Sequence, residues 1–85
     1  MMKRKKVWSC NDETGEYIGG ITRWELFVGD ERGQTKLWLK ENGMHAARIL
    51  VAPSEPEGYQ VEESRSYRPK KVRAAIARWA RKAAG

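Results

Sequence analysis

Hydrophobic and polar residues alternate along residues 16–28 with the period of a β-strand. In an extended chain the even-numbered side chains share one face, which places Trp24 and Leu26 together, while Glu25 falls on the other face. A helix would scatter both sets around its axis, so the alternation predicts a strand. Gly19–Gly20 inside this run predicts a bulge, a bend or a place where another backbone comes close.

Shorter segments with β-strand character flank this run on both sides. We expect strands at about residues 5–10, 34–40, 45–52 and 59–64, separated by turn-forming clusters at about 11–15, 29–33, 42–43 and 53–58. The cluster Gly29–Gly33 is expected to form a hairpin loop, because glycine supplies the positive φ that such loops need. Residues 44–48 fit the start of a short helix equally well, so that alternative stays open.

The period changes to that of a helix near Pro69. Val72, Ile76, Trp79 and Ala83 recur at steps of three and four residues and fall within about 60° of one another on a helical wheel. Proline near the start and an abundance of alanine favour a helix of about 15 residues. The predicted fold class is therefore α+β, a small antiparallel sheet of four to five strands with one C-terminal amphipathic helix packed on one face.

The length and composition limit both the architecture and the chemistry. The 85 residues allow a single domain. With one cysteine, Cys10, and one histidine, His45, we expect no intrachain disulfide, no metal site and no cofactor, and a reducing cytoplasmic location. No catalytic triad or phosphate-binding loop is recognisable, so an enzyme is not expected. No apolar run approaches the roughly 18 residues of a membrane span, so a membrane partner is not expected either.

The net charge of +6 divides into three unequal parts along the chain. Residues 1–6 form a basic N-terminal segment of +4. The β-rich body at 7–64 contains eleven acidic and five basic residues, which gives −6. From Arg65 to the C-terminus there are eight basic residues and no acidic one, and most of them belong to the expected helix at 69–84. Such segregation is typical of a surface that binds a polyanion.

These observations predict a small, non-catalytic nucleic-acid-binding module. Lysine and arginine side chains that neutralise phosphates release condensed counterions, which favours binding without any contact to the bases. Trp38, with Lys36 and Lys40 on the same strand face, is expected to stack a base while the lysines hold the flanking phosphates. The predicted contact residues are Lys3, Arg4, Lys5, Lys6, Lys36, Trp38, Lys40, Arg68, Lys70, Lys71, Arg73, Arg78, Arg81 and Lys82.

Two alternatives stay open at this point. Trp38 could instead lie under the helix and pack against Trp79, with Leu37 and Leu39 on the open face or under another strand. The chain could also be a protein inhibitor or adaptor of the kind encoded by phages and mobile elements, which would bind an acidic surface of a larger, nucleic-acid-handling host protein. The sequence does not distinguish DNA from RNA, and it does not fix the oligomeric state.

Overall fold

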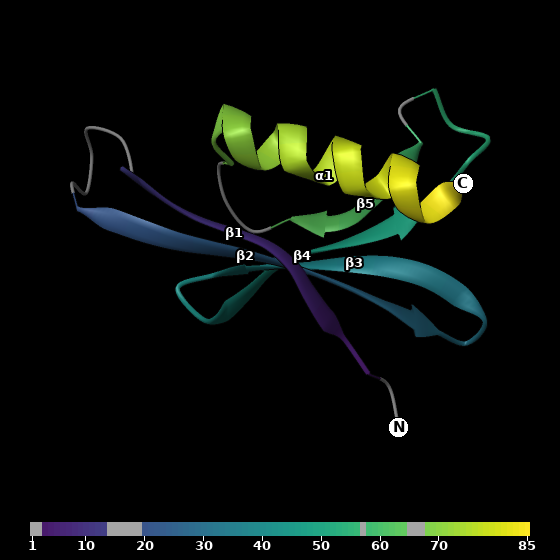
Figure 1. The fold of residues 1–85 in the computed structure, drawn as a ribbon, viewed down its shortest axis with the longest axis horizontal. Coiled ribbons are helices and arrows are strands. Elements are labelled where there is room, and N and C mark those ends of the chain that lie inside the picture. The colour runs from purple at the N-terminus through teal and green to yellow at the C-terminus, as the bar shows by residue number, and fades with distance from the viewer. Residues whose placement is uncertain (1–2, 14–19, 57, 65–67) are drawn as a thin grey trace.

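The computed structural model describes residues 3–13, 20–56, 58–64 and 68–85, and it confirms the α+β fold (Figure 1). The elements are β1 (Lys5–Glu13), β2 (Ile21–Glu31), β3 (Gln34–Glu41), β4 (Met44–Val51), β5 (Tyr59–Ser64) and α1 (Lys70–Ala84). The strands form one sheet in the order β1-β2-β3-β4-β5, and every neighbouring pair is antiparallel. Neighbours in the sheet are thus neighbours in the sequence.

Two-residue turns connect the three central strands. Arg32 and Gly33 have φ values of 53° and 78°, and Asn42 and Gly43 have 52° and 83°, as tight hairpin turns require. The Asn42 Oδ1 accepts a hydrogen bond of 2.9 Å from the Arg23 N–H, and the Asn42 N–H donates one of 2.8 Å to the Arg23 carbonyl. The turn predicted at residues 42–43 is therefore confirmed.

The expected length of the hairpin loop is wrong, and the alternative left open at residues 44–48 is resolved in favour of the expected strand. The hairpin loop is shorter than Gly29–Gly33, because β2 continues to Glu31 and only two residues make the turn. Residues 44–48 are part of strand β4, since pairing with both β3 and β5 outweighs their weak helical pattern. Gly20 has a φ of 92°, while Gly19 and the expected strand residues 16–18 lie outside the described residues.

The main hydrophobic core lies between α1 and one face of the sheet. The helix begins after Pro69 and buries Val72 and Ile76, as its apolar spacing predicts, while Trp79 is only partly buried. The sheet contributes mainly alternate residues from its strands, and the buried ones include Trp24, Leu26, Leu37, Leu39 and Ile49. Burying each large aliphatic side chain contributes about 1.5–3 kcal/mol, so this layer carries most of the stability.

Trp38 lies on the sheet face that points away from α1, and it is nevertheless only 2% exposed. The guanidinium of Arg4 covers its ring, with Cζ 3.9 Å from the ring centroid. Neither expectation for this tryptophan is met, because it is not under the helix and it is not an open stacking surface. Leu37 and Leu39 occupy the helix-facing core instead.

Gly29 allows the N-terminal residues to approach this second face closely. A Cβ atom at position 29 would lie 2.7 Å from the Lys3 carbonyl oxygen and 3.2 Å from Cζ3 of the Trp38 ring. The first distance is shorter than a van der Waals contact, so a side chain here must displace the N-terminal backbone. The glycine is required by packing inside a strand and not by a turn.

We expect Gly29→Ala to lower the free energy of unfolding by about 1–3 kcal/mol, because it overpacks this contact. The measurement is urea denaturation followed by circular dichroism. The same substitution in a chain lacking residues 2–4 is the control, since that deletion removes the Lys3 carbonyl. An equal cost in both backgrounds would contradict the packing explanation.

Candidate nucleic-acid interface

All charged residues on the outer face of α1 are basic. Its six cations, all exposed, are Lys70, Lys71, Arg73, Arg78, Arg81 and Lys82, and the helix contains no acidic residue. At 100° per residue, Lys70, Arg78 and Arg81 lie within about 80° of one another, on the side opposite the buried stripe. Ala74 lies between them, and its small side chain projects less from the helix than those of the cations. The amphipathic period that builds the core therefore also builds this basic face.

Most of these cations have no acidic neighbour. Lys71 Nζ lies 3.4 Å from Asp12 Oδ1 on β1, and Lys82 Nζ lies 4.6 Å from the centroid of the Trp79 ring. No carboxylate within the described residues forms an ion pair with Lys70, Arg73, Arg78 or Arg81. Their charges are therefore not neutralised by the described part of the protein.

Arg68 differs from the helix cations. It precedes α1, is only partly exposed, and its Nη1 atom is buried without a hydrogen-bond partner. The structure places it at the entrance of the helix and not on the exposed basic face.

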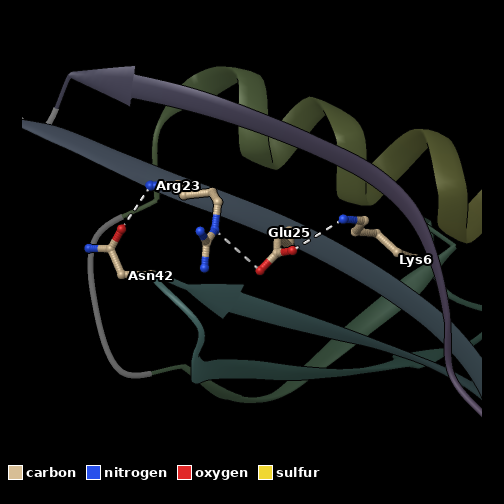
Figure 2. Close-up of polar contacts among 4 residues, drawn as sticks. All are labelled: Lys6, Arg23, Glu25 and Asn42. Atoms are coloured by element: carbon tan, nitrogen blue, oxygen red, sulfur yellow. Dashed lines mark hydrogen bonds and ion pairs between the residues drawn. The ribbon is translucent and has the colours of Figure 1, made fainter.

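Residues 3–6, the described part of the basic N-terminal segment, lie away from α1, on the other side of the molecule (Figure 1). Arg4 covers Trp38, and Lys6 Nζ is 3.4 Å from Glu25 Oε2 on the helix-free face. Figure 2 shows Lys6 and Arg23 approaching the same carboxylate from two strands, with Arg23 Nε 3.6 Å from Glu25 Oε1. The described residues of the two basic ends therefore do not combine into one surface.

Lys36 and Lys40 are also used within the protein. Lys36 Nζ lies 2.9 Å from Glu31 Oε1 and 3.7 Å from Glu62 Oε2, and its side chain is only 11% exposed. The hydrogen bond from Lys36 lowers the pKa of Glu31. Lys40 Nζ lies 5.0 Å from the centroid of the Phe27 ring. With Trp38 covered, these three residues do not form the expected base-stacking surface in this structure.

An ion-pair network crosses the helix-free face and was not anticipated from the sequence. Arg48 Nε lies 2.7 Å from Glu62 Oε2, close enough for an ion pair but without the alignment of a hydrogen bond. Through Glu62 this pair joins Lys36 to strands β4 and β5. The alternation within each strand determines which sheet face a charged side chain occupies. Which charged side chains lie next to one another depends on the register between strands, which the alternation does not give.

Two hollows flank α1. One, of about 350 Å³, lies between β1 and the helix and is lined by Trp8, Cys10, Lys71, Ala74, Ala75 and Arg78. The other, of about 670 Å³, lies at the helix C-terminus, where Tyr59 and Arg81 contribute to its wall. Burial raises the pKa of the Cys10 thiol, and the positive charge of Lys71 opposes this only in part. The thiol is therefore mostly protonated at neutral pH, which does not favour a nucleophilic role.

Within the described residues, no group of three or more histidine, cysteine, aspartate or glutamate side chains is arranged to hold a metal ion. None of the described helices has the length and apolar character needed to cross a membrane. No family model, curated protein or solved structure matches the chain. The exposed basic face of α1 is thus the feature of the described structure that most clearly suggests a function.

We expect Lys36→Met to destabilise the protein at neutral pH, because Glu31 and Glu62 lose their shared cation. The low pKa of Glu31 contributes stability above its unfolded-state pKa, and that contribution is lost as the pH falls through the folded-state pKa. The variant should therefore lose less stability than wild type on acidification, measured by urea denaturation between neutral pH and pH 3. Identical pH dependence in the two proteins would show that the ion pair does not act this way.

Proposed function

We propose that this protein is a non-catalytic nucleic-acid-binding module whose contact surface is the outer face of α1. The observation that carries the proposal is the set of six exposed cations on one helix, with no acidic residue among them. A solvated helix face with no ligand more commonly mixes both signs of charge, because opposite charges four residues apart stabilise it. Here that source of stability is absent.

The position of two of the lysines supports a role outside folding. Lys70 and Lys71 occupy the first turn, where the partial positive charge of the helix N-terminus disfavours cations by about 0.3–1 kcal/mol. Asp12 offsets this for Lys71 alone. A polyanion lying along the helix would compensate for both.

The composition of the helix favours binding to phosphates without recognition of a base sequence. α1 contains no asparagine, glutamine, serine, threonine or acidic residue, so its side chains could form hydrogen bonds to base edges only through arginine and lysine, which bind guanine. Arginine and lysine contact phosphates readily, and the small side chain of Ala74 allows a backbone to come close. We therefore assign affinity to charge and expect little discrimination among sequences.

We expect the affinity for DNA or RNA to fall steeply with salt. A plot of the logarithm of the association constant against the logarithm of the salt concentration should have a slope of about −3 or steeper, because each phosphate contact contributes about −0.7 to −0.9. Arg78→Ala with Arg81→Ala should reduce the magnitude of the slope by about 2. Fluorescence anisotropy titrations at several salt concentrations measure both quantities.

Lys3→Ala with Arg32→Ala is the matched control, since it removes the same charge from two exposed positions off the helix. This control should change the slope much less. A flat salt response, no binding at low salt, or equal effects of the two double variants would contradict binding through α1.

A further inference from the structure

Strand β1 leaves one long edge of the sheet without a described partner. It has nine residues, and on its inner side it pairs only with β2. An edge strand of this length exposes a row of backbone N–H and C=O groups that can pair with another strand. Strand β5, at the opposite edge, is shorter, with six residues.

The charges along β1 are arranged so that the strand complements itself. It begins with Lys5 and Lys6 and ends with Asp12 and Glu13. When two copies of such a strand pair in antiparallel orientation, the basic start of each lies beside the acidic end of the other. Strand β5 has no such pattern, because its two charged residues, Glu62 and Glu63, are both acidic.

The register of β1 against β2 shows which side chains would meet. Lys5, Trp8, Cys10 and Asp12 pair with Val28, Leu26, Trp24 and Thr22, which places them on the helix-facing side of the sheet. The chain steps over Val7 in this pairing. With the same step and a twofold axis at Ser9, Lys5 of one copy lies opposite Asp12 of the other, and Trp8 lies opposite Cys10.

The central pair is suited to burial. Trp8 and Cys10 are partly exposed in the single chain and line the 350 Å³ hollow beside this edge. A second strand at the edge would remove apolar surface of both residues from water on both copies, and that adds to the backbone hydrogen bonds. The ion pairs then favour this register, because moving the twofold axis along the strand separates Lys5 of one copy from Asp12 of the other.

We infer that two copies of this chain associate through antiparallel pairing of their β1 edges, giving a continuous ten-stranded sheet. The twofold axis of such a pair is perpendicular to the sheet, so both α1 helices lie on the same face. The inference stands on the edge of β1 and does not require that the helix bind nucleic acid.

Charge reversal tests the inference directly. Lys5→Glu places two acidic residues opposite each other at both ends of the interface, and Asp12→Lys places two lysines there. We expect each variant to raise the dimer dissociation constant by at least about tenfold, because like charges directly opposite are destabilising. An equimolar mixture of the two should form a heterodimer, because every opposed pair then has opposite charges.

The measurement is sedimentation velocity from micromolar to millimolar protein, with native mass spectrometry of a mixture in which one variant is isotope-labelled. Circular dichroism confirms that each variant is folded, and Arg32→Glu controls for the change in net charge because it lies in an exposed turn.

A heterodimer at concentrations where each variant alone is monomeric supports the proposal. Wild-type protein that stays monomeric at millimolar concentration, a mixture that forms no heterodimer, or assembly into species larger than a dimer would overturn it. The last result would indicate pairing of β1 with β5 of the next copy. Nucleic-acid titration of the monomeric Lys5→Glu variant reports separately on α1, because this substitution leaves the ion pair between Asp12 and Lys71 in place.

Discussion

In the described part of the chain a single helix provides the second layer for a five-stranded sheet. The arrangement of the other side chains follows from the fact that one helix covers only one sheet face. The stripe of α1 centred on Val72 and Ile76 packs mainly over β3, β4 and β5. Because one side of the helix is fully used for the core, its outer side is free to carry charge. Because no second helix within the described residues covers the other sheet face, that face needs another means of excluding water from Trp38.

The helix-free face is completed by polar groups. Arg4 covers the Trp38 ring, Lys40 approaches Phe27, and Glu62 joins cations from two neighbouring strands. Acidic side chains of the body are thus paired in part with the body's own cations and in part with Lys6 of the N-terminal segment. Within the described residues, the helix cations other than Lys71 form no ion pair with a carboxylate. The unpaired positive charge of the protein therefore lies mainly along α1.

The sequence predicted the elements well because two periods, of two and of about 3.6 residues, are local properties. The bounds of β5 and α1 and the turn at residues 42–43 followed from this local information. The function of Gly29 did not, since its neighbour Lys3 is far away in the sequence. Trp38 was also misplaced, because spacing assigns a residue to a sheet face but does not say what covers that face.

Sequential pairing of the strands has a consequence for how the protein acquires its structure. Each strand pairs with the strand that precedes it in the sequence, and β2, β3 and β4 are joined by turns of two residues. Forming the central sheet therefore costs little loop-closure entropy. Pairing between strands that are adjacent in the sequence lowers the mean sequence separation of contacts, which favours faster folding than in sheets built from distant strands. The helix follows all five strands, and its contacts are chiefly with β3, β4 and β5. A chain emerging from the ribosome could therefore assemble the hairpins before the residues that cover them have been synthesised.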